Sequence, residues 1–278
     1  MAANDKRPEY ALGNTSAEDE RLAWQAERFD PLTERFFRKA GINVGDRVLD
    51  LGSGAGHVAM LVSRIVGPTG EVVGVERDAD SISRAKARVA EAGLRNVSFI
   101  QSDVSDIPRR DPFDAAVGRF ILMFLPDPVR VVRSLSQLIR PGGVIAFHEV
   151  SWAEFLQRCA HLPLCSAGAL LIHETFQRTG ANTEMGPALI PVYSDAGLDA
   201  PTMTTDMLLG NAADLTRWLV DIIGVLRPEI QELGLSLAKI GDVETLPERL
   251  LAELAASDGV VGGPDLVGGW SKTSANSN

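Results

Sequence analysis

The chain has 278 residues, of which 45% are hydrophobic and 23% charged, values typical of a soluble globular protein with one large or two small domains. Its 27 basic and 37 acidic residues give a formal net charge of -10, which repels phosphate backbones and anionic lipids, so we expect neither a nucleic-acid partner nor a membrane. Two cysteines cannot build a disulfide scaffold, the polar start is unlike a signal peptide, and no apolar run approaches the ~18 residues of a spanning helix. We therefore expect a cytoplasmic protein.

The first predicted element is a helix over residues 18–40, where apolar side chains recur with helical spacing. We expect residues 1–40 to form a helical lid. The helix is expected to present Leu22, Gln25, Phe29, Leu32, Phe36 and Phe37 to the core.

Between residues 46 and 149, short apolar runs alternate with helical patterns, as in βα units that feed a parallel sheet. Asp80 is the expected N-cap of the second helix in this region, and Gly93 is expected to close it. Asp127 and Pro128 predict the start of the next helix, which RPGG is expected to end. The five expected strands are RVLDL, EVVGVE, VSFIQSD, FDAAVG and GGVIAFHE.

After the core, which we place at residues 41–150, the pattern changes. Residues 156–179 are predicted to be helical, residues 203–209 form a possible strand, and residues 214–255 are mostly helical. The segment GVVGGPDLVGGW indicates a late strand with glycine interruptions, and the polar tail is expected to fray. We expect residues 151–278 to complete the same domain and shape a substrate pocket.

The segment Asp50-Leu51-Gly52-Ser53-Gly54-Ala55-Gly56 joins the first strand to a helix, at the sheet edge where open α/β sheets bind ligands. Glycine allows backbone angles that other residues avoid and lets a ligand lie against the main chain. The alternative is a tight structural turn. A dinucleotide loop has the spacing G-x-G-x-x-G, whereas this chain reads G-x-G-x-G and places a carboxylate, Asp50, two residues before the first glycine. A carboxylate there favours a cationic cofactor such as S-adenosylmethionine.

Two further acids end the next two strands. Glu76 is placed to accept hydrogen bonds from ribose hydroxyls, as the acid of an adenosine-binding Rossmann half does. Asp103 lies where an adenine amino group is expected, although its side chain could instead cap the following turn.

These motifs, together with Gln101-Ser102-Asp103-Val104, Phe113-Asp114 and Arg140-Pro141-Gly142-Gly143, resemble those of class I S-adenosylmethionine-dependent methyltransferases. The resemblance covers residues 41–150. It implies a Rossmann-like α/β fold with a mostly parallel seven-stranded sheet flanked by helices, an N-terminal helical lid and C-terminal helical additions. A weaker likeness, in Tyr10-Ala11-Leu12-Gly13 and the later Met185-Gly186, points to the small-molecule branch, either bacterial natural-product or UbiE-like. The implied cofactor-binding residues are Asp50, Gly52, Ser53, Gly54, Gly56, Glu76, Arg77, Asp103, Val104 and Arg119.

Methyl transfer from a sulfonium mainly needs alignment and exclusion of water, so a general base is optional. His148, at the end of the fifth strand, is the first candidate base, with backbone bonding as its alternative role, and His173 is the second. His57 is expected to order the cofactor loop or simply to occupy the start of the helix. We expect no metal site, because Cys159, His161 and Cys165 match no tight ligand spacing.

The acceptor is expected to be a small organic molecule methylated on oxygen, nitrogen or carbon. Each aromatic or apolar residue near the sheet edge could pack in the core instead of contacting the acceptor. Two other functions stay open: a non-methylating reaction, such as a cyclisation, that uses the bound cofactor, and a non-catalytic cofactor-binding module. A homodimer is possible. The expected substrate-binding residues are Tyr10, Phe120, Met123 and Trp152, with Trp24, Phe29 and Phe155 as further wall residues.

Overall fold

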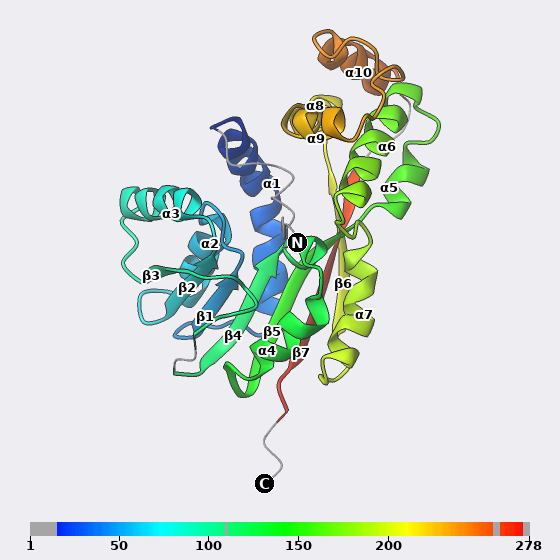
Figure 1. Ribbon diagram of the computed structural model, residues 1–278. Coiled ribbons are helices and arrows are strands. Elements are labelled where there is room, and N and C mark those ends of the chain that lie inside the picture. The colour runs from blue at the N-terminus through cyan, green and yellow to red at the C-terminus, as the bar shows by residue number, and fades with distance from the viewer. Residues whose placement is uncertain (1–15, 109–110, 258–261, 275–278) are drawn as a thin grey trace, which may run out of the picture. The chain divides into compact units, whose positions relative to one another are not determined.

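The structure is a computed structural model that describes residues 16–108, 111–257 and 262–274. The chain divides into two compact units. The sheet unit contains Ala23–Val150, Glu184–Asp206 and the segment from Leu266 onward. The helical unit contains Ser151–Thr183, Met207–Asp265 and the segment up to Leu22. Figure 1 labels the helices and strands of both units.

The sheet unit is built on a seven-stranded sheet with the order β3-β2-β1-β4-β5-β7-β6. β1 pairs in parallel with β2 on one side and with β4 on the other; β3 and β5 extend the parallel pairing outward. The strand order therefore reverses between β1 and β4, which makes the carboxyl ends of these two strands the topological switch point. The strands are β1 (Arg47–Leu51), β2 (Glu71–Glu76), β3 (Val97–Gln101), β4 (Phe113–Arg119), β5 (Ile139–Ser151), β6 (Thr202–Leu209) and β7 (Gly262–Lys272).

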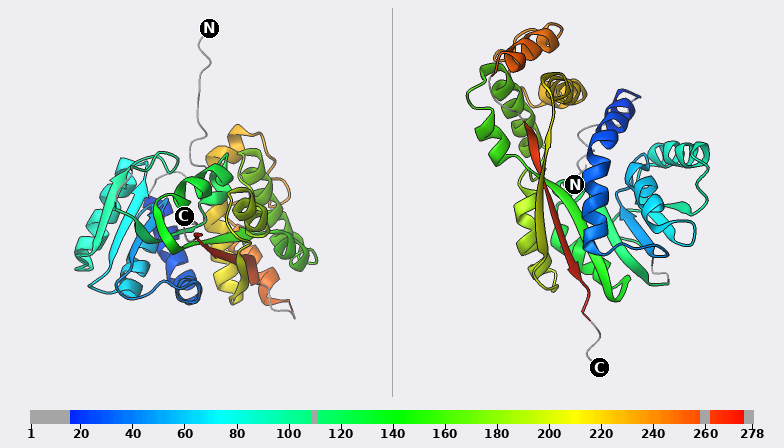
Figure 2. Two further views of the ribbon diagram at one scale, coloured as in Figure 1. Left: turned by 90° about the horizontal axis from the view of Figure 1, so that it is seen from below. Right: turned by 180° about the vertical axis from the view of Figure 1, so that it is seen from behind.

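Helices cover this sheet because their apolar stripes match its buried strands. α1 (Ser16–Ala40) lies across the strands in the view from behind (Figure 2), and its Phe36 and Phe37 pack in one core cluster with α2 and with β1 and β4. α4 contacts α7. The other helices that belong to this unit are α2 (His57–Val66), α3 (Ala79–Glu91), the short 3-10 helix η1 (Leu122–Phe124), α4 (Pro128–Ser136) and α7 (Met185–Asp195).

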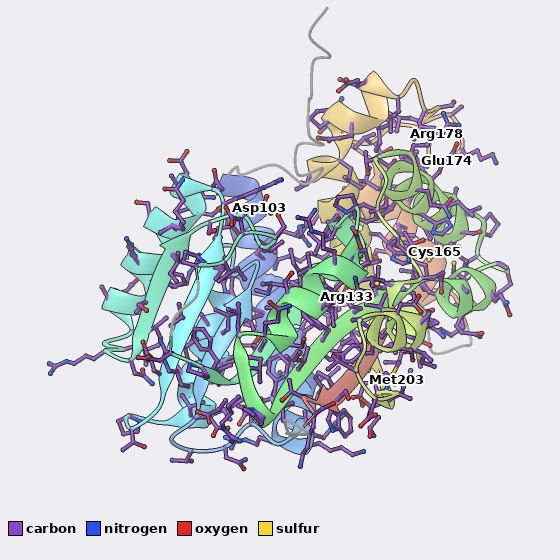
Figure 3. All side chains as sticks on the ribbon, turned by 60° about the horizontal axis from the view of Figure 1, so that its bottom comes forward. Asp103, Arg133, Cys165, Glu174, Arg178 and Met203 are labelled. Atoms are coloured by element: carbon purple, nitrogen blue, oxygen red, sulfur yellow. The ribbon has the colours of Figure 1, made fainter. Side chains whose placement is uncertain are left out.

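The helical unit has an aromatic core of its own. The Trp152 ring lies 5.7 Å from Phe155, 5.7 Å from Trp218 and 6.0 Å from His173, measured between ring centroids. The Glu253 carboxylate accepts the backbone N–H groups of the first turn of α6, and Figure 3 labels Cys165 there. The helices are α5 (Ala153–Arg158), α6 (Pro163–Arg178), α8 (Ala212–Val225), α9 (Arg227–Glu232) and α10 (Leu246–Ala255).

The structure confirms the seven-stranded, mostly parallel sheet and the five expected core strands, with differences in detail. RPGG does not lie before the fifth strand: β5 begins at Ile139 and contains it, with an irregular register against β4. The predicted helix over residues 156–179 is interrupted between α5 and α6, and residues 214–255 form parts of three helices. α7 was not predicted, because Gly186 and two prolines mask its helical pattern. The predicted start of the lid, residues 259–261 and the end of the tail lie outside the described residues.

The expected N-cap of α3 is wrong by two residues. Asp78, not Asp80, has the extended backbone of a cap, and its side chain accepts the Ser81 N–H at 2.7 Å. Asp80 lies in the first turn with an exposed side chain. Within the described parts of the chain, we find no helix that is both long and apolar enough to cross a membrane.

The cap assignment predicts that Asp78→Ala lowers the free energy of unfolding by about 1 kcal/mol, since Ser81 loses its hydrogen-bond acceptor. Asp80→Ala is the matched control and should cost less than half of that, because its carboxylate acts only through the helix dipole. Urea denaturation of both variants measures the difference. An equal or larger loss for Asp80→Ala would contradict the assignment.

Candidate functional site

The loop after β1 takes its shape from three glycines and from Glu76, the last residue of β2. Gly52, Gly54 and Gly56 have φ values of 64°, 50° and 86°, in the left-handed region that glycine tolerates. The Glu76 carboxylate accepts the Gly54 N–H at 2.9 Å with one oxygen and the Arg77 and Asp78 N–H groups at 2.8 and 3.0 Å with the other. Open space surrounds Gly54 on its Cβ side. A ligand can therefore approach the main chain closely here.

Asp50 lies near the carboxyl end of β1 as a buried carboxylate that is 1% exposed. Its Oδ2 atom has no hydrogen-bond partner among the described residues. Burial raises the pKa of Asp50 from 3.8 to about 8; Arg119 opposes the increase and Glu76 adds to it. The backbone of Ala59, in the first turn of α2, also opposes the increase in the pKa of Asp50. A cationic group placed at the free oxygen would relieve its desolvation.

Arg119, the last residue of β4, connects α1 to the strand ends. Its side chain is 5% exposed and donates to Asp30 at 3.0 Å and to the Thr33 hydroxyl at 3.1 Å. Burial lowers the pKa of Arg119, and Asp30 opposes that shift. The Thr33 hydroxyl in turn lies 3.2 Å from Nδ1 of His148. This chain of contacts fixes the face of α1 against the carboxyl ends of β4 and β5.

His148 is a fully buried base, whereas His57 is half-buried. Burial, reinforced by the charge of Arg119, lowers the pKa of each from 6.5 to about 3, so both imidazoles are neutral at physiological pH. The His148 ring packs against Phe36, and its Nε2 atom has no partner among the described residues. Such an imidazole can accept a hydrogen bond at Nε2 but is a weak proton acceptor.

Sequence reasoning missed Glu149, which follows His148 on β5. Its side chain is fully buried, and one carboxylate oxygen accepts the N–H groups of Ile121 and Leu122 at 3.0 and 2.8 Å. Burial raises the pKa of Glu149 from 4.5 to about 7. The available signal was an acid at the end of a buried strand, the same signal that selected Asp50 and Glu76.

Asp103 follows β3 (Figure 3) and bonds within its own turn. Its Oδ1 atom accepts the N–H and the hydroxyl of Ser105 at 2.9 and 2.7 Å. The alternative role as a turn cap is therefore present, and contact with adenine stays a prediction. Of the other expected cofactor residues, Val104 is half-buried, Arg77 is exposed, and Ser53 has a buried hydroxyl without a partner among the described residues.

The expected acceptor residues fall in different parts of the chain. Phe120 packs edge-to-face on Phe29 at 5.8 Å, and Met123 is buried, both within the sheet unit. Trp152 and His173 belong to the aromatic core of the helical unit, whereas Tyr10 lies outside the described residues. Over the described ranges, no group of three or more His, Cys, Asp or Glu is placed to hold a metal ion.

Comparison with known proteins gives a family model described as a methyltransferase domain, which matches residues 42–184, just over half of the chain. An arsenite methyltransferase from Halobacterium salinarum is 34% identical over 112 residues, which are 40% of this chain and 29% of that relative. A ubiquinone/menaquinone biosynthesis C-methyltransferase from Pseudomonas aeruginosa is 34% identical over 114 residues, 40% of this chain and 44% of the relative. The matches thus span less than half of either relative.

Among solved structures, the YcgJ protein from Bacillus subtilis superposes with a TM-score of 0.55 at 17% identity, covering 88% of this chain and 97% of that one. This likeness shows a shared fold.

The raised pKa of Asp50 predicts how the free energy of unfolding of the ligand-free protein depends on pH. Because its pKa is higher in the folded than in the unfolded protein, its contribution is complete below pH 4 and is lost as the pH rises towards 8. Asp50→Asn removes that loss and should raise the free energy of unfolding at pH 8 by at least about 1 kcal/mol. Denaturant unfolding at pH 6 and pH 8 measures it. The gain should be smaller at pH 6; a variant less stable than the parent at pH 8 would refute the assignment.

Proposed function

The chain belongs to the methyltransferase domain family, and from this premise we propose that it transfers a methyl group from S-adenosylmethionine to a small organic acceptor. The observation that carries the proposal is the buried Asp50 carboxylate with its unpartnered oxygen beside an open glycine loop. Of the cofactors that bind a Rossmann-like strand end, one with cationic groups fits a buried carboxylate, whereas a pyrophosphate would be repelled.

The residues present fit S-adenosylmethionine, which supplies an already activated methyl group when bound. In the proposal, Asp50 and the Gly52–Gly56 loop, with the Ser53 hydroxyl, hold the methionine end. Glu76 holds the ribose, since its two oxygens keep acceptor capacity beyond the three backbone bonds that they make. Asp103 and Val104 meet the adenine, with Arg77 at the exposed rim. Arg119 supports this site through the field that it exerts on Asp50.

The catalytic contribution of the chain is then alignment and desolvation, which supply most of the acceleration available to a displacement on sulfonium. His148 is a candidate to orient an acceptor hydroxyl or amine through Nε2. Its pKa of about 3 makes it a weak base, which favours acceptors that are already nucleophilic. His173 remains a candidate from the helical unit.

We propose the chemical class of the acceptor from the apolar and aromatic side chains expected to contact it. Phe120 and Met123, both on the sheet unit, suit a compact, largely apolar molecule, and contacts from Tyr10 and Trp152 stay predictions. The two curated relatives are named for arsenite and for a quinone precursor pathway, and both names describe methylation of small molecules. A homodimer, a cytoplasmic location and the lack of a nucleic-acid partner belong to the proposal as well; the last rests on the charge of -10.

The cofactor proposal predicts that the protein binds S-adenosylhomocysteine and not NADH in calorimetric titration. Glu76→Ala should weaken binding at least tenfold, because the loop loses the acceptor of the Gly54 N–H, the turn after β2 loses the acceptor of two more, and the ribose loses its acceptor. Glu71→Ala, at the opposite end of β2, is the matched control and should change the dissociation constant less than twofold.

Binding of NADH in place of S-adenosylhomocysteine would overturn the enzyme class. If S-adenosylhomocysteine binds, an acceptor screen follows, in which methylation releases one S-adenosylhomocysteine per product. Product formed without that release would indicate a cyclisation or another non-methylating reaction.

A further inference from the structure

The segment that follows β4 carries an unusual backbone conformation. Phe120 has a φ of 54°, and it is the only residue other than glycine with positive φ among the described residues. A side chain in the left-handed region costs about 1–2 kcal/mol, so the conformation persists only where neighbouring contacts hold it. The Phe120 N–H donates to the His148 carbonyl at 3.0 Å, which ties the start of the segment to β5.

Glu149 holds the rest of the segment. Its carboxylate accepts the N–H groups of Ile121 and Leu122, which are the first donors of η1. The N-cap residue of η1, Ile121, offers no side-chain acceptor. The Glu149 carboxylate, on β5, therefore caps the start of η1 in place of a local side chain. Charged acceptors make stronger hydrogen bonds to N–H groups than neutral ones.

Ile121 links this segment to the glycine loop by direct contact. A Cβ added at Gly52 would overlap the Ile121 side chain, so that side chain lies directly on the Gly52 backbone. The same side chain fills the space beside Gly118 on β4. Any shift of residues 120–122 would therefore remove the support on one side of the loop.

We propose that Glu149 is a positioning residue for the cofactor loop, acting through the backbone of Ile121 and Leu122 and the contact of Ile121 with Gly52. The inference rests on the proposed function, because it assumes that the loop binds the cofactor. Glu149 acts at a distance and does not touch the cofactor.

The test uses the full chain, calorimetry with S-adenosylhomocysteine, and hydrogen exchange read by mass spectrometry. Glu149→Leu removes the acceptor, and we expect the dissociation constant to rise at least tenfold and exchange to speed up in peptides covering residues 51–56 and 119–124. Glu149→Gln keeps a carbonyl oxygen for the two N–H groups and should bind within about threefold of the parent.

The matched control is Asp114→Leu. Asp114 also accepts a backbone N–H, from Arg47 at 2.8 Å, but lies at the amino end of β4. We expect it to lower the melting temperature without changing the affinity for S-adenosylhomocysteine or exchange at the two loops. A general effect of lost stability would instead change all of these together.

Two results would overturn the proposal: a folded Glu149→Leu protein that binds S-adenosylhomocysteine within twofold of the parent, or equal weakening by Asp114→Leu. If Glu149→Leu does not fold, Ile121→Ala takes its place, because it removes the contact with Gly52 and keeps the hydrogen bonds to Glu149. Binding of S-adenosylhomocysteine that is at least fivefold weaker supports the proposal, and unchanged binding overturns it. A parent protein that fails to bind S-adenosylhomocysteine would refute the proposed function itself, which separates the two failures.

Discussion

The site depends on a carboxylate that folding forces out of water. Asp50 lies near the carboxyl end of β1, beside the point where the strand order reverses, and it is 1% exposed. The folded chain compensates only in part, through the Ala59 backbone and the charge of Arg119. The remaining cost is the kind of destabilisation that functional sites retain, because a ligand with the opposite charge can relieve it.

Two carboxylates at the strand ends share a second task, which is to satisfy backbone N–H groups. Glu76 accepts from the glycine loop, Glu149 accepts from the start of η1, and the Ala59 backbone opposes the raised pKa of Asp50. Loops at the edge of a sheet expose donors that no strand can pair, so acids from neighbouring strands supply the acceptors. The same residues thereby help to define the geometry of the loops.

Much of this arrangement follows from local sequence. β1 and β2 are short, largely buried runs, and Asp50 and Glu76 are visible as the first acids near their carboxyl ends. Asp127 caps α4 as predicted, whereas the cap of α3 was less predictable: Asp78 and Asp80 are both plausible, and only the backbone geometry selects Asp78. Glu149 was missed because its partners are 27 and 28 residues away in sequence, and no spacing rule reports such contacts. The division into two units, which assigns His148 and His173 to different units, also depends on long-range packing.

The most direct measurement is the number of protons released when S-adenosylmethionine binds, from calorimetry at pH 7 in two buffers of different ionisation enthalpy. At that pH the free Asp50, with a pKa of about 8, holds a proton, whereas the amino group of the ligand is already mostly protonated. A cation bound beside Asp50 lowers its pKa, so the account predicts release of close to one proton per ligand. Binding with no proton release, or with net uptake, would contradict the central role of Asp50.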